Sequence, residues 1–273
     1  MTPFLARQER FDRVASTNDV VRAWLAAGTP EVCLAVADEQ TAGRGRAGRI
    51  WVAPRGAALL SSLGFRPTWL DPERAWRLAA ITALAMADAA EEVAGLAGGA
   101  IRLKWPNDLV VELVGTGRDG GIRKVAGLLG ETEGLGTADP RVVVGLGINA
   151  DWLPADFPPE LAGSMTSLRE AAHGRPIDLA RLLDAFVGRI EARVEALRGG
   201  RFDVAGWQDR QVTTGRTVRL ERPDGNETVQ AIGVDVATGA LIVGDEAAPG
   251  GERQVIVGEI SHVRLAAPVG AVV

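Results

Sequence analysis

A loop rich in glycine and arginine lies between two apolar segments early in the chain, and it constrains the fold more than any other feature. Within residues 38–51 the two residue types alternate: Gly43, Arg44, Gly45, Arg46, Gly48 and Arg49. Glycine lets backbone N–H groups approach an anion closely, and guanidinium groups can donate paired hydrogen bonds to phosphate oxygens. The loop therefore predicts a phosphate-binding site. A flexible basic loop that binds nothing is the alternative.

The same loop matches the pattern G-x-G-x-x-G, which dinucleotide-binding folds carry. In those folds a helix begins directly after the loop, so that its N-terminus meets the pyrophosphate. Here residues 50–54 predict a short strand that stops at Pro54 instead. We therefore reject a dinucleotide-binding fold for this chain.

The composition limits the class of ligand that this loop can serve. The chain has 273 residues, enough for one large domain with a smaller second one, and its formal net charge is -5 with a pI near 5.3. An acidic surface repels nucleic acid, so the basic loop is a local feature of an acidic body. We expect a small anionic ligand and no nucleic-acid partner.

The cysteine and histidine residues exclude two further classes of site. Cys33 is the only cysteine and lies in an apolar segment, which predicts a buried thiol without disulfides and favours a cytoplasmic location. The two histidines, His173 and His262, have no Cys or His neighbour at metal-ligand spacing, so a zinc site is not expected. The most apolar helical segment, residues 78–90, is interrupted by polar residues, so we expect no membrane partner.

The order of predicted elements favours an α+β fold, with a mixed sheet and flanking helices. Residues 16–19 form an N-cap pattern that predicts a helix, and further helices are expected at 71–93 and 177–197. Strands are expected at residues 32–37, 57–65, 101–105, 109–113, 125–131, 142–148, 217–221, 228–236, 240–243 and 254–263. The short strands after residue 212 predict a small β barrel, so the expected domains are 1–212 and 213–273.

Three further segments place polar residues at the ends of predicted strands. Residues 104–108 read Lys-Trp-Pro-Asn-Asp and present Asn107 and Asp108 at a turn; alone, they are only a turn. Residues 124–127 read Lys-Val-Ala-Gly, and a lysine that begins a strand is usually a solvated charge. Residues 144–149 are expected to form a strand that contains two glycines and ends at Asn149. By itself, this segment has poor strand propensity.

Taken in order, Ser-Thr-Asn at residues 16–18, the glycine–arginine loop and these three segments resemble the biotin protein ligases. The resemblance spans residues 16–149 specifically and continues through the C-terminal barrel, which is similar to the family's SH3-like domain. It implies that biotin and MgATP form biotinyl-5′-AMP and pyrophosphate, and that a lysine of a biotin carboxyl carrier domain, from an acyl-CoA or pyruvate carboxylase, then displaces AMP. Biotin and ATP would be the substrates and Mg²⁺ the cofactor.

The resemblance also implies roles for individual residues. The catalytic residues would be Lys124, Asp108 and Arg46. Biotin would be bound by Ser16, Thr17, Asn18, Gln40, Gly43, Arg44, Lys124 and Gly127. The nucleotide would be bound by Arg44, Arg46, Arg49, Trp51, Asn107, Lys124, Asn149 and Trp152. Asp108 would orient or deprotonate the incoming lysine, whose ordinary pKa is about 10.4, or would help Asn107 to hold Mg²⁺.

The chain departs from the family pattern at two places. Ala47 stands where many members have another arginine, and residues 108–124 are longer than usual, which predicts an inserted hairpin tip at 115–121. A lipoate-type ligase is the nearest alternative, because it shares a related fold and also forms an adenylate. A pure binding module is disfavoured, since binding alone does not require the lysine, the aspartate and the arginines together.

Some members of the family carry a winged helix-turn-helix ahead of the ligase core and act as biotin-responsive repressors. Only fifteen residues precede Ser16 here, so we expect a form without that DNA-binding domain. The sequence leaves a homodimer open.

Overall fold

The structure, a computed structural model, describes residues 3–112, 121–222, 225–257 and 262–265. Its larger sheet has seven strands in the order β1-β2-β3-β7-β6-β5-β4. These strands are β1 (Arg7–Phe11), β2 (Cys33–Ala37), β3 (Ala58–Phe65), β4 (Ile101–Lys104), β5 (Asp108–Glu112), β6 (Ile122–Glu133) and β7 (Arg141–Asn149). Strand β1 pairs parallel to β2 and the other neighbours pair antiparallel, so the sheet is mixed, as predicted.

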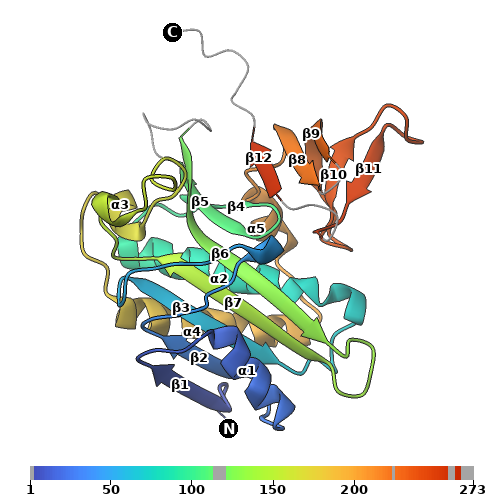
Figure 1. Cartoon of the computed structure of the whole chain (residues 1–273). Coiled ribbons are helices and arrows are strands. Elements are labelled where there is room, and N and C mark those ends of the chain that lie inside the picture. Colours follow the sequence, from blue (N-terminus) through green and yellow to red (C-terminus); the bar gives the residue numbers. More distant parts are fainter. Residues whose placement is uncertain (1–2, 113–120, 223–224, 258–261, 266–273) are drawn as a thin grey trace.

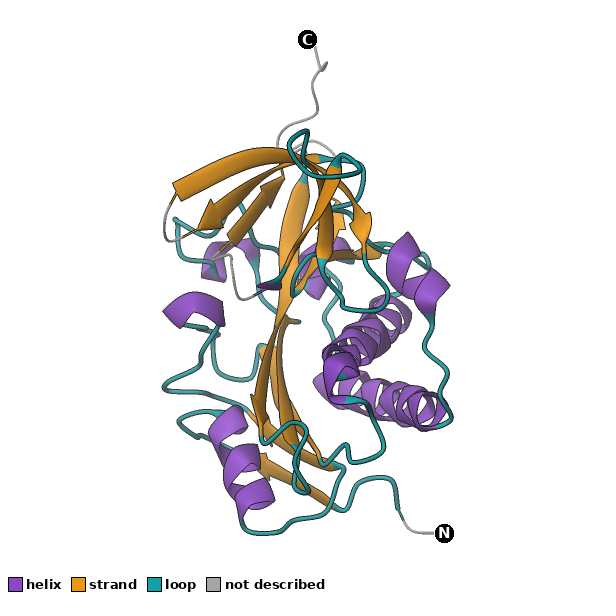
Figure 2. Cartoon of the chain, turned by 90° about the vertical axis from the view of Figure 1, so that its right-hand side faces the viewer, coloured by secondary structure: helices purple, strands orange, loops and turns teal. Residues whose placement is uncertain are grey.

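Helices cover both faces of this sheet (Figures 1 and 2). The helices are α1 (Thr17–Ala26), α2 (Trp76–Ala94), α3 (Leu168–Ala171), α4 (Leu179–Arg198) and α5 (Val204–Asp209), with short 3-10 turns at Arg46–Gly48, Pro72–Arg74 and Pro154–Asp156. Helix α1 packs on one face, where Val21, Trp24 and Leu25 contact β2 and β7. Helices α2 and α4 pack together on the opposite face, over the main apolar core.

Helix α1 begins where the sequence predicted, but N-capping by the Ser16 side chain is not the reason. Ser16 occupies the N-cap position with an extended backbone, yet its side chain makes no capping hydrogen bond. Ser16, Thr17 and Asn18 are all buried. Their polar side chains are therefore available for contacts outside the helix.

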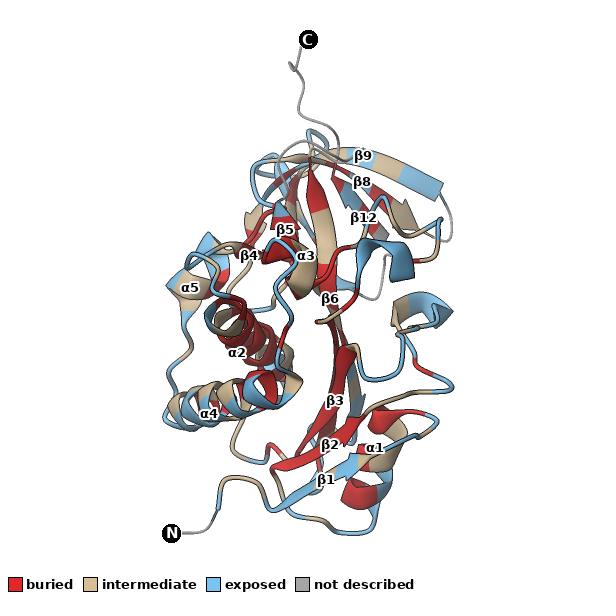
Figure 3. Cartoon of the chain, turned by 90° about the vertical axis from the view of Figure 1, so that its left-hand side faces the viewer, coloured by how far each residue is buried: buried red, intermediate tan, exposed pale blue. Residues whose placement is uncertain are grey.

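The core is built on small residues in α2 and on apolar runs in the strands. Figure 3 shows that α2, β2 and β3 are largely buried. Strands β2 and β3 are buried along their whole length, as expected of strands covered on both faces. The Cys33 thiol in β2 is fully buried, which raises its pKa to about 11. The prediction of a buried thiol is confirmed.

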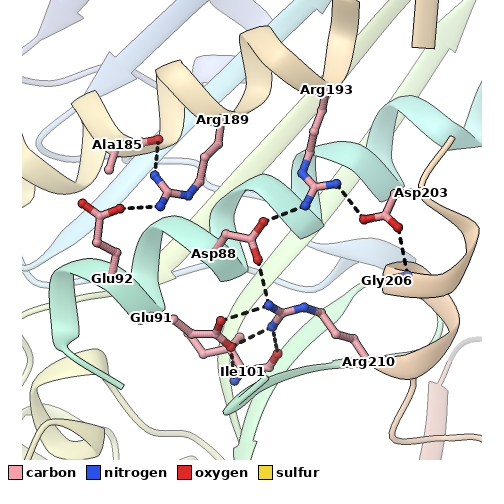
Figure 4. A network of polar contacts seen from close by, with 10 residues as sticks. All are labelled: Asp88, Glu91, Glu92, Ile101, Ala185, Arg189, Arg193, Asp203, Gly206 and Arg210. Carbon is pink, nitrogen blue, oxygen red and sulfur yellow. Dashed lines mark hydrogen bonds and ion pairs between the residues drawn. The ribbon is translucent and has the colours of Figure 1, made fainter. Parts of the chain in front are cut away.

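A buried ionic network joins α2, α5 and β4 (Figure 4). Arg210 donates to Glu91 at 2.7 and 2.9 Å and to Asp88 at 2.7 Å. Glu91 is only 5% exposed and also accepts the backbone N–H of Ile101. The hydrogen bond with Glu91 raises the pKa of Arg210.

We expect Arg210→Met to lower the free energy of unfolding by about 3–5 kcal/mol, because Glu91 would remain buried without its cation. Urea denaturation measures the change. Arg189→Met is the matched control, since Arg189 pairs with the more exposed Glu92 and its loss should cost about 1 kcal/mol or less. Equal effects of the two substitutions would contradict the assignment.

The second sheet follows α5 and is antiparallel throughout, in the order β11-β10-β9-β8-β12. Its strands are β8 (Thr217–Arg222), β9 (Gly225–Val234), β10 (Leu241–Gly244), β11 (Glu252–Val255) and β12 (His262–Leu265). The segment between β9 and β10 contacts the first part of the chain: Trp76, at the start of α2, donates its indole N–H to Ala237 O, and Trp105, just after β4, donates its indole N–H to Gly239 O. The fold class is confirmed: a mixed sheet with flanking helices and a separate C-terminal antiparallel sheet.

Two predicted strands are wrong. Residues 254–263 are not one strand, because β11 ends at Val255 and β12 begins at His262. Residues 50–54 make only an isolated bridge, Ile50 to Arg44, because Trp51 N donates to Gly43 O and closes the loop there. Sequence reasoning also missed β1.

The predicted hairpin tip at 115–121 lies, apart from Gly121, outside the described residues. In the part of the chain that is described, no helix is both long and apolar enough to cross a membrane.

Candidate active site

A cavity of about 430 Å³ lies on the α1 side of the larger sheet, and it collects most of the predicted site residues. The predicted residues on its wall are Ser16, Thr17, Asn18, Gln40, Arg44, Arg46, Arg49, Trp51, Asn107, Asp108, Lys124 and Gly127. Residues 263–265 of β12 add a wall from the second sheet. Segments that are far apart in the sequence thus meet at one place.

Three predicted residues are not on this wall. Gly43 is buried, and a Cβ there would lie 2.5 Å from Trp51 O, so glycine lets the two arms of the loop meet. Asn149 is fully buried and donates to Thr166 O, while its Oδ1 has no partner among the described residues. The indole N–H of Trp152 is buried without a partner in the same part of the structure. The nucleotide contacts of Asn149 and Trp152 stay predictions.

A β-bulge aims Lys124 into the cavity. The register between β5 and β6 shifts after Leu109, so that Ala126 pairs with Leu109 but Lys124 pairs with Val110. In a regular strand Lys124 and Gly127 would face opposite sides, because side chains alternate. The extra residue reverses the alternation. A Cβ on Gly127 would accordingly lie 2.8 Å from Lys124 Nζ, on the same face.

Lys124 is held on three sides. Its Nζ pairs with Asp108 Oδ1 at 2.7 Å and lies 5.3 Å from the centre of the Trp51 ring. Its backbone N–H donates to Ser164 O, and its carbonyl accepts from Thr166 N. The two predicted catalytic residues therefore form one ion pair in the cavity wall, on a rigid backbone.

Glycines form the floor of the cavity on β6 and β7. A Cβ on Gly147 would lie 2.5 Å from Trp51 Cε2, and a Cβ on Gly127 would lie 3.2 Å from Trp51 Cζ3. The indole of Trp51 thus lies flat against two glycines, as the missing side chains allow.

We expect Gly147→Ala to weaken substrate binding at least about tenfold, because the added methyl group must displace the Trp51 ring from the cavity floor. Isothermal titration with biotin and with ATP, the substrates that the sequence resemblance implies, measures the change. Gly130→Ala is the matched control, since a Cβ at Gly130 in β6 meets nothing within 4 Å. Unchanged affinities in Gly147→Ala would show that the ring position does not matter.

One end of the cavity is a polar pocket built from α1, β3 and the loop. Gln40 Oε1 accepts from Thr17 N at 2.7 Å and from Thr17 Oγ1 at 3.1 Å. Ser62 Oγ lies 2.7 Å from Thr17 Oγ1 and 2.6 Å from Asn18 Oδ1. This fixed set of hydroxyl and amide groups suits a small neutral polar group with both donors and acceptors.

The arginines of the loop are not equivalent. Arg44 forks onto Asp19 at 2.7 and 2.8 Å, and this contact lowers the pKa of Asp19 and raises that of Arg44. Arg46 lies at the other end, where it donates to Val257 O at 2.7 Å and faces Asn107 Oδ1 at 3.4 Å. Burial lowers the pKa of Arg46, which the charge of Asp108 partly opposes. A guanidinium removed from water in this way interacts strongly with an anion.

The oxygen ligands near Lys124 suit magnesium only when the substrate supplies further oxygens. Among the described residues no group of three or more His, Cys, Asp or Glu could hold a metal ion. Asp108 and the Asn107 amide are the oxygen donors at this point of the wall. Mg²⁺ takes one or two carboxylates together with substrate phosphates, so these residues fit a magnesium ion that arrives with a nucleotide.

Sequence reasoning missed several residues of the site. Ser62 is fully buried in β3, and a pair of serines in an otherwise apolar strand was the available signal. Lys104 and the segment that carries Glu160, Leu161, Ser164 and Met165 also line the cavity. No motif marks that segment; its place follows from its bridge to Lys124.

The sequence and the fold are similar to those of known proteins. A biotin--[acetyl-CoA-carboxylase] ligase of Mycobacterium tuberculosis is 33% identical over 257 residues, which cover 92% of this chain and 87% of that protein. The bifunctional ligase/repressor BirA of Bacillus subtilis is 31% identical over 226 residues. That match covers 82% of this chain but only 65% of the relative, so the chain matches less than two thirds of that relative's length.

A solved structure of the biotin protein ligase from Aquifex aeolicus, in complex with biotin and ATP, has a TM-score of 0.75 and 25% identity. The likeness covers 95% of this chain and 99% of that chain. The model of the biotin/lipoate A/B protein ligase family matches residues 10–149, which contain the loop, the lysine–aspartate pair and the glycine floor. The chain belongs to the biotin/lipoate A/B protein ligase family.

Proposed function

We propose that the protein is a biotin protein ligase that joins biotin to ATP and transfers the biotinyl group to a carrier lysine. The observation that carries this proposal is the convergence of a neutral polar pocket and a cluster of cations in one cavity. Biotin has a neutral cyclic urea at one end and a carboxylate at the other, so its two ends match the two ends of the cavity. In this proposal residues 1–212 form the catalytic domain and residues 213–273 the C-terminal domain.

In the first step a carboxylate oxygen of biotin attacks the α-phosphorus of ATP, and the bond to the bridging oxygen of pyrophosphate breaks. Two anions must approach each other, so positive charge at the point of contact lowers the barrier. Lys124 and Arg46 supply that charge from opposite sides of the Asn107–Asp108 turn. The urea head lies among Thr17, Asn18 and Gln40, at the polar end of the cavity.

In the second step a carrier lysine attacks the acyl carbon of biotinyl-5′-AMP, and the bond to the phosphate oxygen breaks to release AMP. The amine must lose a proton to become a nucleophile. Asp108 becomes available as the proton acceptor once Lys124 pairs with the adenylate instead of with Asp108. The same ion pair thus serves both steps.

Magnesium would be held by Asp108 and Asn107 together with the phosphates of ATP. Bound there, it would offset phosphate charge and assist the departure of pyrophosphate. The carrier is a biotin carboxyl carrier domain of a carboxylase in this proposal.

The test compares two acids that members of this family activate. The pure protein is incubated with ATP, Mg²⁺ and either biotin or lipoate, and pyrophosphate release is followed. Biotin should drive release and lipoate should not. Release with lipoate alone would make the protein a lipoate-type ligase, and release with neither acid would reject acid activation.

A further inference from the structure

Glu131, on the same strand as Lys124, connects to the polar pocket through two different kinds of contact. Asn18 Nδ2 donates to Glu131 Oε2 at 2.7 Å, and Arg22 pairs with Glu131 Oε1 at 2.7 Å. Arg44 of the glycine–arginine loop lies 3.7 Å from the same oxygen. One carboxylate therefore joins β6, α1 and the loop at the rim of the pocket.

We propose that Glu131 is a positioning residue that fixes the hydrogen-bond direction of the pocket for the urea head of biotin. The proposal rests on the proposed function, because it takes biotin as the substrate. Glu131 itself does not line the cavity; it acts through Asn18, which does.

The orientation of the Asn18 amide follows from which of the surrounding groups can donate a hydrogen bond and which can only accept one. A carboxylate can only accept, so Glu131 must face the Asn18 amide nitrogen and not its oxygen. Asn18 Oδ1 is then turned towards Ser62, whose hydroxyl donates to it at 2.6 Å. Ser62 Oγ also lies 2.7 Å from Thr17 Oγ1, so the Ser62 hydroxyl connects the Asn18 amide to Thr17, and both Asn18 and Thr17 line the cavity. A cyclic urea presents two N–H donors and one carbonyl acceptor, so its binding depends on the orientation of these groups.

The Asn18 side chain is closely packed against the sheet. Its amide lies directly over Gly145 of β7, where a Cβ would collide with it. Asn18 is only 4% exposed. Because the side chain is confined, a change of the Glu131 acceptor acts on the amide orientation and not on where the side chain lies.

The charge of Glu131 also restrains the loop. Arg44 is forked onto Asp19 and faces Glu131, while Arg22 contacts both carboxylates. This arrangement of two arginines and two carboxylates fixes the first arm of the loop against α1. Gln40, which accepts two bonds from Thr17, lies just before this arm.

The experiment measures biotin affinity and steady-state kinetics in the parent protein and in Glu131→Gln. Glutamine keeps the shape but loses the charge, and its amide can present either atom to Asn18. We expect the Kd and the KM for biotin to rise at least about tenfold, with the KM for ATP and kcat changed less than about threefold. Glu133→Gln is the matched control, because Glu133 lies two residues along the same strand and its side chain is 64% exposed.

A second variant separates positioning from a loss of structure. In the double variant Asn18→Asp with Glu131→Gln, the amide and the carboxylate exchange places, and the new aspartate can still accept from Ser62. Biotin affinity should return to within a few-fold of the parent value. Thermal unfolding of each variant shows whether the fold is kept.

The outcomes are distinct. If the parent protein binds no biotin, the proposed function fails. The inference about Glu131 is overturned if the parent binds biotin and Glu131→Gln binds it equally well. It is also overturned if Glu131→Gln raises the KM for biotin and for ATP alike, or if the double variant binds no better than Glu131→Gln.

Discussion

Replacing Lys124 with alanine is expected to slow adenylate formation by about a hundred- to a thousandfold. The loss of one preorganised charge at the reacting centre costs about 2.7–4 kcal/mol. Lys124 is preorganised by the β-bulge, by its backbone bonds to residues 164 and 166 and by its ion pair with Asp108. Biotin-dependent exchange of pyrophosphate into ATP measures the rate.

The fold of this variant needs its own control, because alanine leaves the carboxylate of Asp108 without its cation. The double variant Lys124→Ala with Asp108→Asn removes that unpaired charge. Its exchange rate should be as low as that of Lys124→Ala, while its thermal stability returns towards the parent value. Near-parental exchange in either folded variant would remove Lys124 from the mechanism.

Replacing Arg46 with glycine is expected to let the intermediate escape. Arg46 spans from the loop to Val257 O and to Asn107, so it holds the loop against the second sheet beside the cavity. Its loss removes a charge-assisted hydrogen bond to phosphate and adds backbone freedom. Free biotinyl-5′-AMP is an activated mixed anhydride, which acylates exposed lysines of any protein nearby. Biotinylation of added albumin, in the presence of biotin and ATP, measures the escape.

The variant Ala47→Gly separates the two effects of Arg46→Gly, which are the loss of the guanidinium group and the gain of backbone freedom. Ala47 has a positive φ of 53°, so glycine fits there without strain and adds freedom to the same loop while every arginine remains. It should label albumin no faster than the parent. If Arg46→Gly makes the adenylate but labels albumin no faster than Ala47→Gly, Arg46 is not the residue that retains the intermediate.

Local patterns in the sequence were sufficient for much of the fold. Asp71 and Pro72 mark the 3-10 turn before α2, because Asp71 accepts a hydrogen bond from Glu73 N within one turn of chain. The pattern at residues 16–19 marks the start of α1, although Ser16 makes no capping hydrogen bond. Strands β3 and β7 are buried along nearly their whole length, so their sequences do not alternate between apolar and exposed polar residues. Residues 254–263 misled because the apolar pattern continues beyond Val255, where β11 ends, and Ile256 and Val257 are exposed.

The sequence predicted which segments form the site, but not how their side chains are arranged in space. The motifs correctly selected residues 16–18, the loop and the lysine–aspartate pair as neighbours, because the resemblance supplied their order. The bulge that aims Lys124 depends on pairing between β5 and β6, which no local pattern encodes. The pair of serines in β3 marks Ser62 as unusual, but Ser62 and Glu131 contact partners that are 44 and 113 residues away in the sequence, and no local pattern identifies those partners.

Detection of both products of the two steps by mass spectrometry tests the central claim most directly. The pure protein is incubated with biotin, ATP and Mg²⁺, first alone and then with a biotin carboxyl carrier domain. The account predicts biotinyl-5′-AMP in the first reaction and, in the second, an amide on one carrier lysine with release of AMP. Biotin bound by the protein without any biotinyl-5′-AMP would contradict it and would leave a binding protein in place of a ligase.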